Sequence, residues 1–184
     1  LTKYIKFHLR LVGWLFDKIS LQFDGSIFAG FMNVYCTFTG SKARFSYNKE
    51  NREFSFSDVG DTYALTFLHK KRALSYRGGL RKRINLLANE YFLDVLQFVD
   101  DDIILDCGAN IGELRLYFKF NEVNVTYIGF EPSPLEFQAL KKNVAPCTVH
   151  NVGLWNESGE LDFYIASQSA DSSLIEPAEY DEVI

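Results

Sequence analysis

The chain has 184 residues, of which 47% are hydrophobic and 23% are charged, and its formal net charge is −5. This composition is typical of a globular protein and argues against disorder along the whole chain. Residues 1–99 carry 15 Lys and Arg against 8 Asp and Glu, whereas residues 100–184 carry 4 against 16. The acidic C-terminal part argues against nucleic-acid binding, because phosphate contacts need clustered Lys and Arg.

Residues 1–20 place apolar side chains at helical spacing, with basic residues mostly off that stripe. The predicted stripe consists of Ile5, Leu9, Val12, Phe16 and Ile19. Such a helix packs on its own protein or lies on an anionic membrane as a peripheral contact. We favour packing on the protein and a cytoplasmic location. Residues 26–39 are apolar but too short and too polar to span a bilayer.

Residues 43–57 alternate apolar and polar groups around a polar turn, which predicts a β-hairpin. Asp61 is expected to cap a helix through residue 68. Residues 70–83 then contain seven Lys and Arg, which form a solvated surface or a docking site for an anionic substrate or a neighbouring acidic segment. Together these features predict that residues 1–84 form an α+β appendage.

Residues 84–99 are predicted to be helical, with Leu86, Leu87, Tyr91, Val95 and Phe98 on one side. The widely spaced Cys36, Cys107 and Cys147 include no CxxC pair, which argues against a disulfide framework or a metal site. We expect three buried free thiols in a reducing compartment.

From residue 100 onward the pattern alternates between strands and helices. Residues 103–105 predict a strand buried on both faces, followed by a glycine turn and a helix over 113–120. Residues 126–130 and 147–152 predict two further strands. Between them, Ser133 and Pro134 predict a capped helix that ends near residue 143. Residues 160–166 predict one more extended segment. This order predicts an α/β fold with a Rossmann-like doubly wound sheet.

The glycine turn carries the first sign of ligand chemistry. Asp106 ends the first strand, and Gly108 and Gly112 follow it at once. Backbone amides at the start of the next helix attract an anionic group, and glycine lets a ligand approach the main chain. The turn is not the G-x-G-x-x-G of dinucleotide enzymes. Asp106 instead suits a ligand end with both an ammonium and a carboxylate, such as the methionine end of S-adenosylmethionine.

Glu131 is the second sign, because it ends the next predicted strand 25 residues after Asp106. A carboxylate in that place can accept hydrogen bonds from both hydroxyls of a ribose. Its simpler interpretation is an acidic residue stabilised by a helix N-terminus, and the two roles can coexist. The pair of acids is more informative than either residue alone.

These motifs resemble the FkbM family of methyltransferases. The resemblance covers residues 85–177 and rests on the segments 106–112 (Asp-Cys-Gly-Ala-Asn-Ile-Gly), 130–134 (Phe-Glu-Pro-Ser-Pro), 151–159, 163–164 and 172–174. It implies an S-adenosyl-L-methionine-dependent enzyme that methylates oxygen on sugars, polysaccharides or related natural products. Its expected partner is therefore a small-molecule or glycan acceptor.

The resemblance also implies a set of cofactor-binding residues. These are Asp106, Gly108, Ala109, Asn110, Gly112, Glu131, Pro132, Asn151 and Val152. The glycine turn would hold the methionine and ribose side, Glu131 the ribose hydroxyls, and Asn151 and Val152 the adenine.

Residues 172–174 resemble the serine-rich segment of the family. Family members continue beyond that segment into a Leu-Asp segment and then a strand with a Lys-x-Asp-x-Glu-Gly pattern, and this sequence stops before both. We therefore expect residues 85–184 to be an incomplete methyltransferase domain that is inactive alone. No catalytic base is assigned, since His150 is expected to be structural and Asp171 has no support. Two alternatives stay open: a nucleotide-sugar or NAD-binding Rossmann enzyme, and a non-catalytic module that docks to a membrane or a partner.

Overall fold

A computed structural model describes residues 13–166, 172–178 and 180–184. Its helices are residues 13–20, α2 (Gly25–Phe38), η1 (Lys70–Arg72), α3 (Ala73–Tyr76), α4 (Leu80–Glu90), η2 (Leu93–Val95), α5 (Arg115–Phe120) and α6 (Pro134–Asn143). Its strands are β1 (Ala43–Asn48), β2 (Glu53–Asp58), β3 (Ala64–Phe67), β4 (Ile103–Cys107), β5 (Thr126–Phe130), β6 (Thr148–His150), β7 (Tyr164–Ile165) and β8 (Glu182–Val183).

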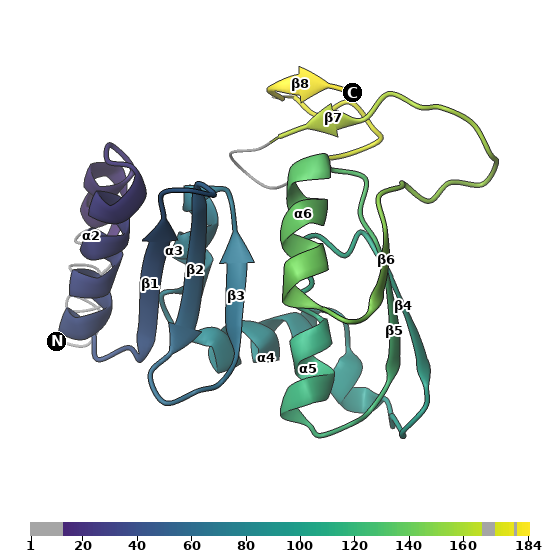
Figure 1. Cartoon of the computed structure of the whole chain (residues 1–184), viewed down its shortest axis with the longest axis horizontal. Coiled ribbons are helices and arrows are strands. Elements are labelled where there is room, and N and C mark those ends of the chain that lie inside the picture. The colour runs from purple at the N-terminus through teal and green to yellow at the C-terminus, as the bar shows by residue number, and fades with distance from the viewer. Residues whose placement is uncertain (1–12, 167–171, 179) are drawn as a thin grey trace, which may run out of the picture.

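The elements form successive layers (Figure 1). Helix α2 packs on an antiparallel sheet of order β1-β2-β3, and α5 and α6 lie between this sheet and a parallel sheet of order β4-β5-β6. The hairpin of β7 and β8 lies above the N-terminal end of α6. The N-terminal half and the parallel sheet are thus joined through α5 and α6.

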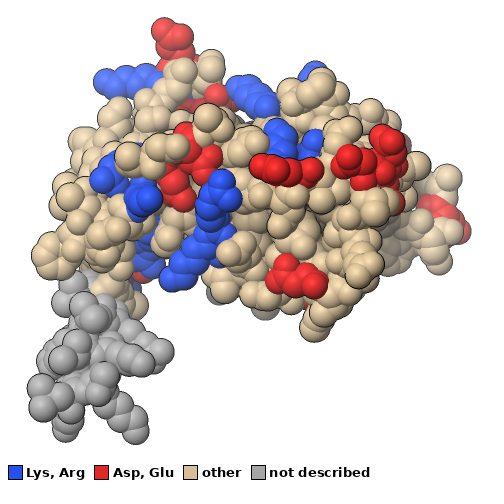
Figure 2. Space-filling model, turned by 90° about the horizontal axis from the view of Figure 1, so that it is seen from below, with Lys and Arg blue, Asp and Glu red and all other residues tan. Residues whose placement is uncertain are grey.

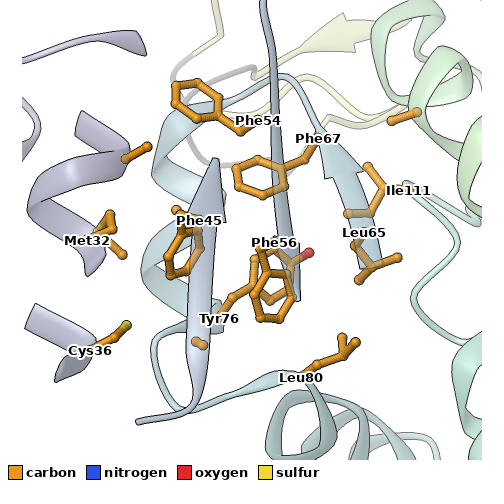
Figure 3. Packing of buried hydrophobic residues seen from close by; sticks show 14 of the residues in the cluster. Met32, Cys36, Phe45, Phe54, Phe56, Leu65, Phe67, Tyr76, Leu80 and Ile111 are labelled. Carbon is orange, nitrogen blue, oxygen red and sulfur yellow. The ribbon is translucent and has the colours of Figure 1, made fainter. Parts of the chain in front are cut away.

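The predicted hairpin is confirmed by the pairing of β1 with β2. Its alternating side chains point into an aromatic core, in which the rings of Phe56 and Tyr76 stack with centroids 4.5 Å apart (Figure 3). The same core includes Ile111 and Leu116 from the glycine turn and α5. The N-terminal region therefore shares its hydrophobic core with the elements that follow residue 84.

The helix predicted after Asp61 is wrong. The Asp61 side chain accepts a hydrogen bond from the amide of Tyr63, which makes a local turn, and β3 then pairs with β2. Leu65 and Phe67 are both completely buried. Pairing with β2 and burial of alternate side chains outweigh the local helical spacing.

The predicted N-terminal stripe is confirmed at only one of its described positions. Ile5, Leu9 and Val12 lie outside the described residues. Phe16 packs on the ring of Tyr35 with centroids 4.7 Å apart, whereas Ile19 is 53% exposed. Within the described part of the chain, no helix combines the length and the apolar character needed to cross a bilayer.

One continuous helix over residues 84–99 is also wrong. Helix α4 begins earlier, at Leu80, and ends at Glu90, after which Phe92 adopts a left-handed backbone with φ of 55°. The buried face of α4 consists of Leu80, Ile84, Leu87 and Ala88, so Leu87 is the one member of the predicted stripe that it buries. Leu86, Tyr91 and Val95 are exposed. This face fits the 3.6-residue period better than the predicted stripe does.

The parallel sheet confirms the α/β class and the alternation of strands and helices. Asp106 pairs with Gly129, and Phe130 pairs with His150, so the carboxyl ends of β4, β5 and β6 lie at one edge. Burial of the first strand on both faces is wrong in this structure, because Ile103 and Leu105 are 68% and 59% exposed. The described helices cover one face of this sheet, and β4 lies at its border (Figure 1).

Three further boundaries differ from the predictions. Helix α5 begins at Arg115, the third strand is limited to Thr148–His150, and the segment over 160–166 contributes only Tyr164–Ile165 to a strand. Helix α6 agrees with its prediction, and the Ser133 side chain accepts a hydrogen bond from the amide of Glu136. The buried-thiol prediction holds for Cys36 but not for Cys107, which is exposed.

Charged side chains are distributed as the sequence suggests (Figure 2). Lys and Arg side chains lie over the left and centre of this face, with some Asp and Glu among them, and the charged side chains at the right-hand end are Asp and Glu. Within residues 70–83, the side chains of Arg72 and Arg83 are largely shielded from solvent, at 7% and 23% exposed. Arg72 and Arg83 form ion pairs with Glu113, and Arg72 also pairs with Glu136, so these two cations contact individual acidic residues that follow residue 84.

Candidate functional site

A cavity of about 350 Å³ lies at the carboxyl ends of the parallel strands. It is lined by Cys107, Gly108, Asn110, Glu131, Pro132, Ser133, Glu136, Val152, Gly153, Leu154, Phe163, Ser172, Ser173 and Leu174. The parallel register brings the ends of β4 and β5 together, and the antiparallel bridge between Tyr164 and Ser173 brings the serine-rich segment to them. Segments far apart in the sequence therefore meet around one space.

Glu131 connects the glycine turn (residues 106–112) to residues 130–134 by hydrogen bonds. Its Oε2 accepts a hydrogen bond of 2.8 Å from the amide of Asn110, and its Oε1 accepts one of 2.8 Å from the amide of Ser133. The residue is only 5% exposed. Burial raises the pKa of Glu131, and the two amide hydrogen bonds act in the opposite direction. Each carboxylate oxygen can still accept a second hydrogen bond, as a ribose diol requires.

The two glycines of the turn have different tasks. Gly108 has φ of +84°, and a Cβ built on it would meet nothing within 4 Å. Gly112 has φ of +83°, but a Cβ on it would lie 2.4 Å from Cγ1 of Val144 and 2.9 Å from Cδ1 of Leu140. Gly108 leaves the main chain open toward the cavity, whereas Gly112 lets the turn pack on α6.

Asn110 contributes an unusual polar atom. Its backbone is left-handed, with φ of 50°, and its Oδ1 is buried without a hydrogen-bond partner. Because a buried acceptor without a donor is costly, this atom is suited to receive a donor from a ligand. Asn110 also lines the cavity.

Four of the nine predicted residues support the cavity rather than line it. Asp106 accepts a hydrogen bond from the Tyr127 hydroxyl, and Ala109 is buried with its Cβ close to Gly129. Asn151 donates from Nδ2 to the carbonyl oxygens of Glu131 and Pro132, at 2.8 and 3.0 Å. The fourth is Gly112. The five that line the cavity are Gly108, Asn110, Glu131, Pro132 and Val152.

Several lining residues were not among the predicted site residues. Ser133 and Glu136 belong to the predicted capping box, and Ser172, Ser173 and Leu174 belong to the serine-rich segment of the family resemblance. Those motifs could have signalled them. Cys107, Gly153, Leu154 and Phe163 also line the cavity, and all four lie within segments that carry the family resemblance. His150 stacks on Phe130 with centroids 5.2 Å apart, in agreement with a structural role.

A second cavity, of about 710 Å³, lies in the N-terminal half beside Tyr47, Arg52 and Lys71. It contains none of the motif residues, and its Lys70 is engaged by Asp24 at 2.5 Å. Among the described residues, no group of three or more His, Cys, Asp and Glu side chains is arranged to hold a metal ion. The cavity at the strand ends is therefore the candidate site.

Comparison with known proteins finds a similar methyltransferase sequence. The chain is 33% identical over 87 residues to the protein named Methyltransferase 1 from Beauveria bassiana (strain ARSEF 2860). The matched part is 42% of this chain and 35% of that protein, so the chain spans about a third of the relative's length. No family model matches the chain, and no solved structure matches it. The similarity supports a methyltransferase in general and does not extend to the FkbM family.

Proposed function

We propose that this chain is the cofactor-binding part of an S-adenosyl-L-methionine-dependent methyltransferase with a Rossmann-like sheet. The observation that carries the proposal is Glu131, whose carboxylate joins the glycine turn to the Glu-Pro-Ser-Pro segment at the ends of two adjacent parallel strands. This is the position in which open α/β sheets bind nucleoside ligands. The similarity to Methyltransferase 1 supports the same reaction class.

The residues present fit a nucleoside with an amino-acid end. Glu131 would hold the ribose hydroxyls, and the unpartnered Oδ1 of Asn110 would receive a hydrogen-bond donor of the ligand. Val152 and Leu154 give the cavity an apolar side for adenine. A pyrophosphate fits less well, because Asp106, Glu131 and Glu136 would add their negative charge to its own.

When bound, S-adenosylmethionine supplies an electrophilic methyl group on a sulfonium. The chain's own part is to bind and orient. Gly108 lets the ligand approach the main chain, and Asn151 fixes the carbonyl groups of Glu131 and Pro132. Correct placement of the reacting atoms accounts for much of the rate acceleration in such displacements.

The acceptor in this proposal is a hydroxyl of a sugar, polysaccharide or related natural product. A hollow of about 860 Å³ adjoins the cavity and shares Val152 and Leu154 with it. It is also lined by Trp155, Glu157 and Asp162. An aromatic ring beside carboxylates suits a sugar, because the ring packs on the C–H face and the carboxylates accept hydrogen bonds from hydroxyls.

Calorimetric titration of the full chain with S-adenosylhomocysteine and with NAD tests the cofactor. We expect binding of the first, and we expect Glu131→Ala to weaken it by well over 1 kcal/mol, since the variant leaves ligand hydroxyls unpaired. Glu50→Ala is the matched control, because Glu50 is exposed on the hairpin turn. Binding of NAD alone would favour a dinucleotide enzyme, and binding of neither would favour a non-catalytic docking module.

A further inference from the structure

Arg72 is a buried cation that contacts two buried acids. Its side chain is 7% exposed, and its guanidinium lies 3.5 Å from Oε2 of Glu113 and 3.4 Å from Oε1 of Glu136. Those two side chains are 8% and 6% exposed. Arg72 ends the short helix η1 that follows β3, so it comes from the N-terminal region.

Both acids stand next to a motif of the candidate site. Glu113 directly follows Gly112, and Glu136 lies in the first turn of α6, three residues after Ser133. Glu136 also lines the cavity. Glu131 already joins these two segments through the amides of Asn110 and Ser133. The Arg72 guanidinium joins the same two segments a second time.

Electrostatics favours this second connection. Two buried carboxylates would repel each other and would be costly to ionise without a cation between them. Arg83 donates to Glu113 at 2.9 Å, and His69 lies 3.6 Å from Glu136, but each of these contacts only one acid. Arg72 is the residue among the described ion pairs that contacts both.

The geometry of the guanidinium suits this task better than an ammonium would. Nη1 faces Glu113 and Nη2 faces Glu136, so the two ends of one planar fork are used at once. Lysine places its charge on a single atom and would contact one acid closely at the expense of the other. The arrangement therefore depends on arginine and not on positive charge alone.

We infer that Arg72 is a positioning residue for the cofactor site: it holds the segments after Gly112 and after Ser133 in their relative positions. The N-terminal region then helps to position the site through Arg72, although none of the motif residues belongs to that region. The inference about ligand binding rests on the proposed function. The inference about the two segments rests on the ion pairs and can be tested without a ligand.

Hydrogen exchange of the full chain measures the effect on the two segments directly. In Arg72→Gln, we expect exchange at residues 108–113 and 131–136 to accelerate by about tenfold or more, because two buried acids lose their common partner. Exchange in β1 and β2 should change much less. Lys71→Gln is the matched control, since Lys71 is the exposed neighbour in the same turn. It should leave both segments as in the wild type.

Titration with S-adenosylhomocysteine supplies the second readout. Arg72→Gln should weaken binding by about tenfold or more, Arg72→Lys should lie between it and the wild type, and Lys71→Gln should bind normally. Arg72→Lys also serves as the test if Arg72→Gln does not fold. Adding Glu136→Gln to Arg72→Gln should restore part of the lost protection, because it removes one of the stranded charges.

Two results would overturn the inference: unchanged exchange in both segments of Arg72→Gln, or equal acceleration throughout β1 to β3, which would indicate a merely structural role. If the wild type itself binds no S-adenosylhomocysteine, the proposed function fails. The exchange measurement then still decides whether Arg72 holds the two segments.

Discussion

The Tyr127 hydroxyl donates a hydrogen bond of 2.5 Å to Oδ2 of Asp106. The two residues lie on adjacent parallel strands, and Tyr127 is two positions before Gly129, the register partner of Asp106. Gly129 leaves room for this diagonal contact, because a Cβ on it would lie 3.2 Å from the Tyr127 ring. Asp106, which is predicted to receive the ligand's ammonium, is thus fixed in place by a hydrogen bond from the buried Tyr127.

Tyr127→Phe should make ligand binding more sensitive to acid. Burial raises the pKa of Asp106, the Tyr127 hydrogen bond lowers it, and Glu113 raises it. Removing the hydroxyl raises this pKa further. If ionised Asp106 supports binding, affinity for S-adenosylhomocysteine is lost as the pH falls through that pKa, so the loss should begin at a higher pH in the variant.

Calorimetry over a series of acidic pH values gives the two profiles. Tyr117→Phe is the control, because it removes another tyrosine–aspartate hydrogen bond, to Asp94, in an exposed place. Superimposable profiles for Tyr127→Phe and the wild type would show that the charge of Asp106 does not matter for binding.

Asp106→Asn should raise the free energy of unfolding at neutral pH and lower the affinity for the ligand. Since the pKa of Asp106 is raised above 3.8 in the folded chain, the folded state binds protons more readily than the unfolded state. Its contribution to stability is present below pH 3.8 and is lost as the pH rises through the raised value. The asparagine cannot ionise, and it can still accept the Tyr127 hydrogen bond.

Chemical unfolding at several pH values checks this. The variant should be the more stable protein at neutral pH, the advantage should vanish toward pH 3.8, and ligand affinity should fall. A variant less stable than the wild type at neutral pH would mean that the Asp106 carboxylate stabilises the fold.

Local chemistry made parts of this structure predictable. The hairpin follows from alternation around a polar turn, and α6 follows from Ser133, Pro134 and the capping hydrogen bond to Glu136. Strand β3 could not be predicted in the same way, because Leu65 and Phe67 fit both a helix and a strand until β2 pairs with them. Long-range pairing decides such segments.

In the candidate site, too, some features could be predicted from local sequence and others depend on long-range packing. The motifs identify which residues gather, but the tasks of Gly108 and Gly112 differ only because Val144 and Leu140 of the α6 region pack on one of them. Arg72 was visible in the sequence as one of seven cations. Its pairing with Glu113 and Glu136 depends on how the N-terminal sheet packs beside α5 and α6.

The two glycines provide a matched pair of substitutions. Gly112→Ala should lower the free energy of unfolding by about 2–5 kcal/mol, because strain at positive φ adds to a clash with α6. Gly108→Ala has the strain without the clash and should cost about 1–2 kcal/mol. Its methyl group would stand in the space proposed for the ligand, so it should weaken S-adenosylhomocysteine binding more than its stability loss suggests.

Denaturant unfolding and calorimetry on both variants test this contrast. Equal stability losses would argue that Gly112 does not pack on α6 as described. Normal ligand affinity of Gly108→Ala would place the ligand elsewhere.

Asn143, at the end of α6, connects the N-terminal sheet to the glycine turn. Its Oδ1 accepts from the Thr66 amide at 2.7 Å, and its Nδ2 donates to the carbonyl oxygens of Thr66 and Ile111, each at 2.8 Å. Asn143→Ala strands three backbone groups, so it should lower the free energy of unfolding by about 2–4 kcal/mol.

The variant should also loosen both ends of the connection. Hydrogen exchange should accelerate at β3 and at residues 108–112, because each loses partners on the same side chain. Gln138→Ala, an exposed substitution on α6, should stay within about 0.5 kcal/mol of the wild type. Faster exchange at β3 alone would mean that the hydrogen bond to Ile111 does not order the turn, and the N-terminal region would then support the site through Arg72 and not through Asn143.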